Sequence, residues 1–222
     1  MLSRVLEPEA MDTPEEASDY DGMDHSEVNR LFVTDFLRAH GPCRGGVVLD
    51  VGTGPARVPI ALCRADSDVI VVGVDLAAAM IVRANENVER EGLTGRIRLV
   101  VGDAKALRLG DGGYEAVISN SIVHHIPDPA PALAEMVRMV APGGTLMVRD
   151  LARPDDVGEL DRLVKTYAVH EPSAARALFA ASLHAALTPD EVRALVWALG
   201  LPPAGVSETS DRHWTWVWKR SQ

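Results

Sequence analysis

The chain has 222 residues, 47% of them hydrophobic, and a formal net charge of −10 at pH 7. This size and apolar content predict one continuous domain over residues 1–222, and the acidic balance argues against a nucleic-acid partner. The sequence shows no run of 18 apolar residues and no signal-peptide pattern, and its two cysteines form no disulfide or zinc framework, so we expect a cytoplasmic protein that does not enter a membrane.

The first 27 residues hold nine acidic residues against Arg4 alone. Such charge runs are generally solvated or disordered, but Tyr20 and Met23 interrupt this one. A helix from about Glu27 to Ala39 is predicted next, with Ser26 or Asp24 as its cap. Its apolar face would hold Val28, Leu31, Phe32 and Phe36. We therefore expect an ordered, helical N-terminal cap over residues 1–40.

An apolar strand at residues 47–51 then opens into a glycine-rich turn before a helix predicted over Arg57–Ala65. Glycines at positions 52 and 54 let the backbone turn tightly and approach a ligand closely. A dinucleotide fingerprint needs a third glycine where Arg57 stands, and Asp50 would repel a pyrophosphate. Both features favour a cationic ligand instead.

The pattern Asp50-x-Gly52-x-Gly54-x-Ala56 resembles motif I of the class I S-adenosylmethionine-dependent methyltransferases, with Ala56 in place of the usual third glycine. A second apolar strand ends at Asp75, 21 residues after Gly54, where an acidic residue usually accepts the ribose hydroxyls. Asp75 alone would also suit a nicotinamide enzyme, so its meaning depends on the motif before it.

A third strand, over residues 96–101, ends in Gly102-Asp103-Ala104, which resembles the strand-three motif of the same family. The resemblance implies that Asp103 accepts the adenine amino group and that the Ala104 N–H binds the ring. The alternative for each strand-end aspartate is a helix N-cap. Three in succession favour the cofactor.

The fourth strand, residues 115–120, leads into a loop that carries His124-His125 and then Pro-Asp-Pro, as in small-molecule and quinone methyltransferases of this class. Either histidine could take the acceptor's proton, and either could simply form the pocket wall. Adjacent histidines in an extended segment point to opposite sides, so we expect no metal site. Asn120 and Ser121 are predicted to hold the methionine part of the cofactor.

The loop lacks the Asn/Asp-Pro-Pro-aromatic motif of enzymes that methylate exocyclic amino groups of bases. This absence agrees with the acidic charge in arguing against DNA or RNA as substrate. The resemblance thus implies S-adenosylmethionine as cofactor, S-adenosylhomocysteine as product, and a small-molecule acceptor. The predicted cofactor-binding residues are Asp50, Gly52, Thr53, Gly54, Asp75, Leu76, Met80, Asp103, Ala104, Asn120, Ser121 and Tyr20.

Beyond the loop, helices are predicted over Ala130–Val140 and Pro189–Leu199, with a strand over Thr145–Asp150 between them. Arg149 and Asp150 end that strand and could contact substrate or form a salt bridge. Residues 154–187 exceed a minimal methyltransferase and show two helical apolar stripes, so we expect a helical lid insertion. Its polar candidates are His170, Arg176 and His184.

The chain ends in a predicted hairpin whose second strand places Trp214, Trp216 and Trp218 on one face. Together these elements predict an α/β fold: a Rossmann-like, seven-stranded, mostly parallel sheet with helices on both faces and a C-terminal antiparallel hairpin. The predicted function is methyl transfer by direct in-line displacement, in a monomer or homodimer. The alternatives are a non-catalytic cofactor-binding protein and a nicotinamide-dependent oxidoreductase.

Overall fold

A computed structural model describes residues 2–43 and 45–222. The described chain divides into two compact units. Of the described residues, the larger unit comprises 10–43, 45–120, 130–148 and 217–222, and the smaller unit comprises 2–9, 121–129 and 149–216. The two units interleave along the sequence, and the single continuous domain over residues 1–222 stays a prediction.

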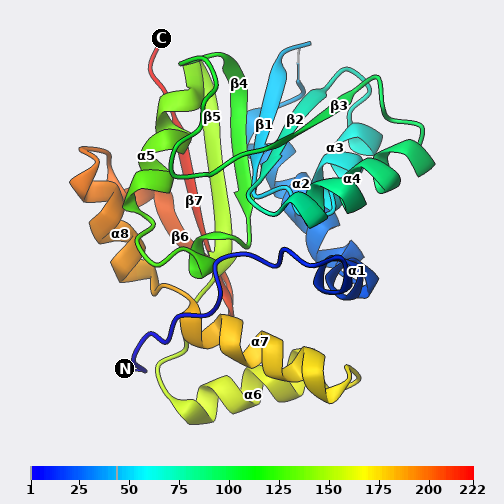
Figure 1. The fold of residues 1–222 in the computed structure, drawn as a ribbon. Coiled ribbons are helices and arrows are strands. Elements are labelled where there is room, and N and C mark those ends of the chain that lie inside the picture. The colour runs from blue at the N-terminus through cyan, green and yellow to red at the C-terminus, as the bar shows by residue number, and fades with distance from the viewer. Residues whose placement is uncertain (1, 44) are drawn as a thin grey trace. The chain divides into compact units, whose positions relative to one another are not determined.

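The strands form one seven-stranded sheet in the order β3-β2-β1-β4-β5-β7-β6 (Figure 1). Their bounds are β1 Val47–Val51, β2 Ile70–Asp75, β3 Ile97–Val101, β4 Tyr114–Asn120, β5 Val140–Leu151, β6 Val206–Ser210 and β7 His213–Lys219. The β1–β2, β1–β4 and β2–β3 pairs are parallel, and β6 pairs with β7 in antiparallel fashion. The predicted sheet and its terminal hairpin are therefore confirmed.

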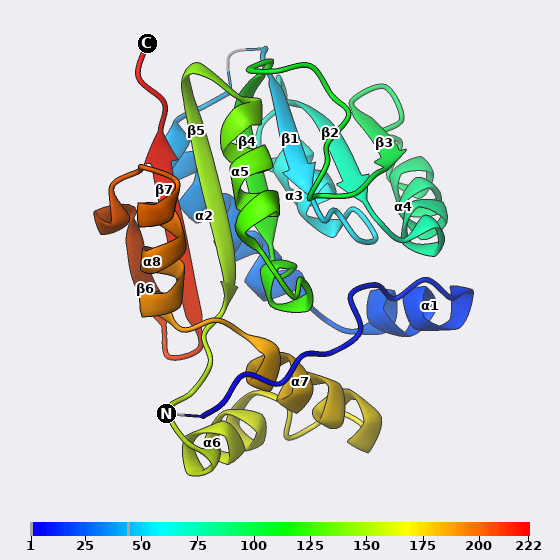
Figure 2. The same cartoon turned by 60° about the vertical axis from the view of Figure 1, so that its left-hand side comes forward.

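The larger unit carries helices on both faces of its strands. Figure 2 shows α5 over β4 on one face and α2 on the other. The helices of this unit are α1 Pro14–Gly22, α2 Ser26–His40, α3 Arg57–Ala65, α4 Ala78–Arg90 and α5 Ala130–Met139. Because each parallel crossover returns through a helix, the carboxyl ends of β1, β2, β3 and β4 meet at one edge of this unit.

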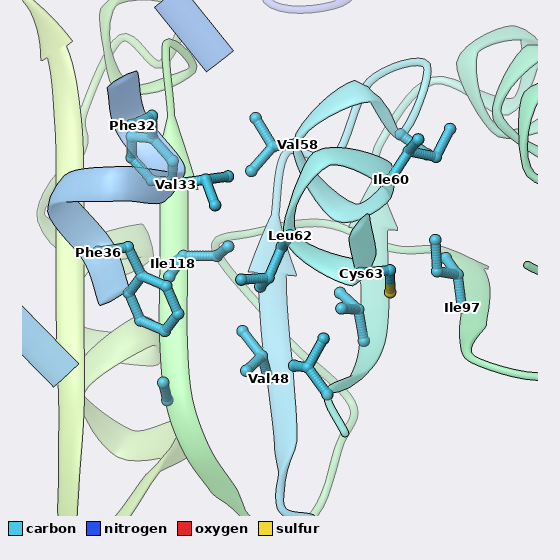
Figure 3. Close-up of a cluster of buried hydrophobic side chains, with 14 of the residues drawn as sticks. Phe32, Val33, Phe36, Val48, Val58, Ile60, Leu62, Cys63, Ile97 and Ile118 are labelled. Carbon is cyan, nitrogen blue, oxygen red and sulfur yellow. The ribbon is translucent and has the colours of Figure 1, made fainter. Parts of the chain in front are cut away.

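The core of the larger unit lies between α2, α3 and the sheet (Figure 3). Phe32 and Phe36 of α2 are fully buried there, beside Leu62 of α3 and Ile118 of β4. Predicted face residues Phe32 and Phe36 are thus core, whereas Leu31 is 45% exposed. Full burial of such side chains contributes about 1.5–3 kcal/mol each, so α2 is fixed by packing rather than by its cap.

The N-termini of α1 and α2 differ from the predicted pattern. Helix α2 begins at Ser26 and its N-cap, His25, makes no side-chain cap hydrogen bond, so neither predicted residue caps it. Asp24 instead accepts the Ser26 N–H at 3.0 Å. Helix α1 begins after a complete capping box, in which Thr13 and Glu16 bond to each other's backbone.

The smaller unit contains the predicted insertion. Helices α6, Val157–Tyr167, and α7, Ser173–Ala185, lie side by side (Figures 1 and 2). Their apolar stripes pack together through Leu160, Leu163 and Leu183. Helix α8, Pro189–Ala198, and the 3₁₀ helices η1, Val123–His125, and η2, Pro203–Gly205, complete the unit. Within the described ranges, no helix is both long and apolar enough to traverse a bilayer.

Candidate functional site

The glycine-rich turn after β1 is held to the end of β2 by main-chain hydrogen bonds. The Gly52 and Thr53 N–H groups both donate to the Val74 carbonyl, at 2.8 and 2.9 Å. The turn residues Gly52, Gly54 and Ala56 all have positive φ, of 75°, 51° and 62°. A Cβ built on Gly54 meets no atom within 4 Å, so the turn leaves open space beside its backbone, as a close ligand requires.

Asp75 links this turn to the start of α4. Its Oδ2 accepts the Gly54 N–H at 2.7 Å and its Oδ1 accepts the Ala77 N–H at 2.9 Å. Burial raises the pKa of Asp75, and these backbone hydrogen bonds oppose the shift. The Leu76 backbone contributes a further hydrogen bond. The carboxylate is therefore fixed in place, and its two oxygens together still have room for a further donor.

Asp50 lies beneath the turn, only 2% exposed, and accepts the Thr53 hydroxyl at 2.7 Å. Burial raises its pKa to about 7, with a smaller contribution from the charge of Asp75 and opposition from the Thr53 hydrogen bond. At neutral pH the carboxyl group is therefore divided between its two protonation states, and a nearby cation would favour the ionised one.

The third strand-end aspartate is more exposed. Asp103 accepts the Lys105 N–H at 2.8 Å, and the Lys105 ammonium lies 3.2 Å from the same oxygen. None of the three strand-end aspartates is a helix N-cap, because those of α3 and α4 are Ala56 and Ala77. The carboxylates are therefore not explained by helix capping.

Helix α1 supplies part of the same region. Tyr20 and Ala17 pack with Ala77 and Met80, which is 6% exposed, and the Tyr20 ring lies 5.2 Å from that of His25. Asp21 pairs with Arg57 at 2.7 Å. The remaining predicted contacts, Leu76 and Ala104, follow β2 and β3, where Leu76 is 41% exposed.

The end of β4 carries two unusual features. Asn120 Oδ1 is buried and has no hydrogen-bond partner in the described structure. Ser121, the next residue, has a positive φ of 60°, a strained conformation for a residue other than glycine. An unpaired buried acceptor and a strained residue at a strand end are both features of ligand sites.

The histidine pair belongs to the smaller unit, and the expectation that its rings point to opposite sides is wrong. Residues 123–125 form the 3₁₀ helix η1 rather than an extended segment, so the two imidazole rings lie together, with centroids 4.1 Å apart. His124 is buried and its Nδ1 lies 2.5 Å from Asp150 Oδ1. Asp150 also accepts the N–H groups of Val123, His124 and Leu151.

Glu7 completes this cluster. Its Oε1 lies 3.4 Å from His124 Nε2 and 3.1 Å from His125 Nδ1, and Ser182 donates to its carboxylate at 3.1 Å. Sequence reasoning counted Glu7 only as part of an acidic run. No periodicity in the sequence connects residue 7 to residue 124. The one weak signal is that Arg4, the sole basic residue of the acidic N-terminal run, lies three residues before Glu7.

Burial and neighbouring charges shift the pKa values of the two histidines in opposite directions. Burial alone would lower the pKa of His124, but Asp150 and then Glu7 outweigh it, so the pKa is raised. Burial lowers the pKa of His125 to about 4, and the charge of His124 adds to that shift. The Arg4 guanidinium fixes the N-terminal segment that carries Glu7. It donates hydrogen bonds to four carbonyls, those of Ala185, Pro127, His124 and Ile126.

The other polar residues predicted as substrate contacts do not form one site. Arg149 donates to Thr215 at 2.8 Å, while Asp150 serves His124. His184 lines an apolar groove formed with Val5, Leu6 and Leu160, whereas His170 and Arg176 are exposed. Glu7 also lines this groove, so one member of the cluster with His124 and His125 borders an apolar surface.

Comparison with known proteins agrees with the strand-end geometry. Residues 48–144 match the family model described as a methyltransferase domain. Over 118 residues the chain is 32% identical to a ubiquinone biosynthesis O-methyltransferase of Methylococcus capsulatus, covering 53% of this chain and 48% of that protein. A phosphatidylethanolamine N-methyltransferase of Cereibacter sphaeroides is 34% identical over 134 residues, or 60% of this chain and 64% of that protein.

These matches span about half to two thirds of the relatives' length, with shares of 48% and 64%. The fold extends further. The crystal structure of a methyltransferase dependent on S-adenosylmethionine from Aquifex aeolicus superposes with a TM-score of 0.69 at 18% identity, covering 93% of this chain and 98% of that one. As the strand-end motifs predict, residues 48–144 thus match a methyltransferase domain, and the fold is shared with a solved methyltransferase that depends on S-adenosylmethionine.

Proposed function

We propose that the chain binds S-adenosylmethionine in the larger unit and transfers its methyl group to a small-molecule acceptor by in-line displacement, releasing S-adenosylhomocysteine. The observation that carries the proposal is the fixed carboxylate of Asp75 beside the open glycine turn. Asp75 would accept the ribose hydroxyls, and Asp103 the adenine amino group. Asn120 would hold the methionine part, and its unpaired side-chain oxygen supports that assignment.

The nicotinamide alternative is less well supported. The position of the third fingerprint glycine is occupied by Arg57, whose guanidinium pairs with Asp21 at 2.7 Å. The buried Asp50 and the half-buried Asp75 place two acidic groups around the turn, where a pyrophosphate would need positive potential. The same two groups favour a sulfonium cation and an ammonium group.

A small-molecule acceptor is supported by three features. The loop after β4 has no base-methylating motif, the chain is acidic, and the matched relatives are named for quinone and phospholipid methylation. The role of His124 or His125 as a base for the acceptor's proton stays a prediction. Asp150 and Glu7 occupy the two sides of the His124 ring.

The test uses cofactor with a labelled methyl group, incubated with the full chain and separate small-molecule, protein and nucleic-acid fractions of a cell extract. We expect label in the small-molecule fraction alone. Asp75→Asn should reduce that incorporation through weaker cofactor binding, whereas the exposed Asp19→Asn should not. Label in the nucleic-acid or protein fraction contradicts the acceptor class. Cofactor binding without transfer to any fraction favours the non-catalytic alternative.

A further inference from the structure

Among the described residues, Glu7, His124 and His125 offer three ligand atoms that lie within 4.8 Å of one another. All three residues, and the side chains that hold them in place, belong to the smaller unit. The segment that carries Glu7 is held beside η1 by hydrogen bonds from the Arg4 guanidinium to the His124 and Ile126 carbonyls. The cluster is therefore a fixed arrangement rather than a chance meeting of surface side chains.

The spacing of these atoms fits a metal ion. Bonds of 2.0–2.1 Å at tetrahedral angles separate neighbouring ligand atoms by about 3.3 Å. Glu7 Oε1 lies 3.4 Å from His124 Nε2 and 3.1 Å from His125 Nδ1. His125 Nδ1 is buried, and apart from its pairing with Glu7 it has no hydrogen-bond partner among the described residues.

The surroundings also have the form of a metal site. A metal-binding histidine usually donates its other ring N–H to a carboxylate, which fixes the tautomer. Asp150 Oδ1 holds His124 Nδ1 at 2.5 Å in this way, and three backbone N–H groups hold Asp150 in turn. Ser182 restrains Glu7 from the opposite side. The carboxylates of Glu7 and Asp150 together would balance the charge of a divalent ion.

We propose that Glu7, His124 and His125 bind a divalent transition-metal ion of the zinc class, with Asp150 positioning His124. Two imidazoles and one carboxylate leave coordination positions open, as in catalytic rather than structural zinc sites. Of the three proposed ligands, Glu7 also lines the apolar groove, where an apolar molecule with an oxygen or nitrogen donor could approach it. A bound ion acidifies such a donor.

The proposal extends the proposed function, but its test measures metal binding and not methyl transfer, so either can fail alone. The full chain is stripped with a chelator and titrated with Zn²⁺ by calorimetry and with Co²⁺ by visible absorption. We expect one ion per chain and the absorption of a four- or five-coordinate Co²⁺ ion with nitrogen ligands. The described cysteines do not compete readily, because burial raises the pKa of Cys43 to about 12 and also raises that of Cys63.

Ligand variants decide whether the cluster holds the ion. Glu7→Gln, nearly isosteric, and His125→Ala should each weaken Zn²⁺ binding by about 100-fold or more, and Asp150→Asn by about 10–100-fold. The exposed His170→Ala and Glu171→Gln are matched controls and should bind Zn²⁺ as the unmodified chain does. Circular dichroism checks that each variant is folded. Stoichiometric Zn²⁺ binding that survives Glu7→Gln and His125→Ala overturns the proposal, as does the absence of Zn²⁺ binding by the unmodified chain.

Discussion

The buried carboxyl group of Asp50 makes the free energy of unfolding depend on pH. Its pKa lies near 7 in the folded chain, compared with an ordinary value of 3.8. Between these values the folded protein holds more protons than the unfolded chain, so the contribution of Asp50 to stability is lost as pH rises from about 4 to about 7. At 1.36 kcal/mol per pKa unit, the loss is at most about 4 kcal/mol.

We therefore predict that Asp50→Asn flattens the fall in unfolding free energy between pH 4 and pH 8. Asparagine can still accept the Thr53 hydroxyl, so the local hydrogen bond is kept. The exposed Asp19→Asn should retain the original slope. Urea denaturation across this range measures the effect. An identical pH slope in the unmodified chain and in Asp50→Asn would contradict the assignment of the titration to Asp50.

Position 73, in the middle of β2, requires glycine because the Thr53 side chain lies too close to leave room for a Cβ. A Cβ built on Gly73 would lie 2.7 Å from Thr53 Oγ1 and 2.9 Å from Leu99 Cδ2. Gly73→Ala should therefore destabilise the fold by about 1–3 kcal/mol and displace Thr53 from Asp50. Gly95→Ala is the matched control, because a Cβ there meets no atom within 4 Å. If both substitutions change the urea midpoint equally, the close approach does not limit position 73.

At the scale of elements, local sequence signals predicted most of the fold. The helix over Arg57–Ala65 has the predicted bounds, and the strand ends at Asp75 and Val101 carry the predicted motifs. These elements have either strict apolar runs or glycine and proline at their ends. Helix α1 was missed, although Thr13-Pro14-Glu15-Glu16 has the same signal as Thr188-Pro189-Asp190-Glu191. The acidic charge of the surrounding segment predicts solvation, whereas the capping box at its centre predicts the helix.

The two capping boxes provide a prediction. Thr13→Ala and Thr188→Ala each remove a cap that contributes about 1 kcal/mol to its helix. In α8, where Val192 and Val196 are fully buried, the loss should lower the global unfolding free energy. In α1 only Ala17 is buried, so the helix should open locally instead. Hydrogen exchange should therefore accelerate in residues 15–22 of Thr13→Ala with a smaller global change. A larger global loss in Thr13→Ala than in Thr188→Ala would contradict this.

At the scale of the whole molecule, the sequence predicted the features that depend on strand order and missed the contacts that join distant segments. The three strand-end aspartates are predictable because each stands at or near the carboxyl end of an apolar strand, and parallel pairing brings those ends to one edge. Glu7 and His124 are more than a hundred residues apart in the sequence but lie in contact. Hydrogen bonds from Arg4 to the His124 carbonyl and from Ser182 to Glu7 hold them there. No local periodicity records such a contact, and the 3₁₀ turn at η1 reverses the expected direction of the two rings.

We propose that the fixed strand-end carboxylate of Asp75 holds the S-adenosyl cofactor. Calorimetric titration of S-adenosylhomocysteine into the full chain and into Asp75→Ala tests it most directly. We expect one binding site per chain, weakened in the variant by about 1–3 kcal/mol, which corresponds to about 5- to 150-fold, because hydrogen bonds to a charged acceptor are lost. Unchanged affinity in Asp75→Ala, or binding of NADH in place of S-adenosylhomocysteine, would contradict the account.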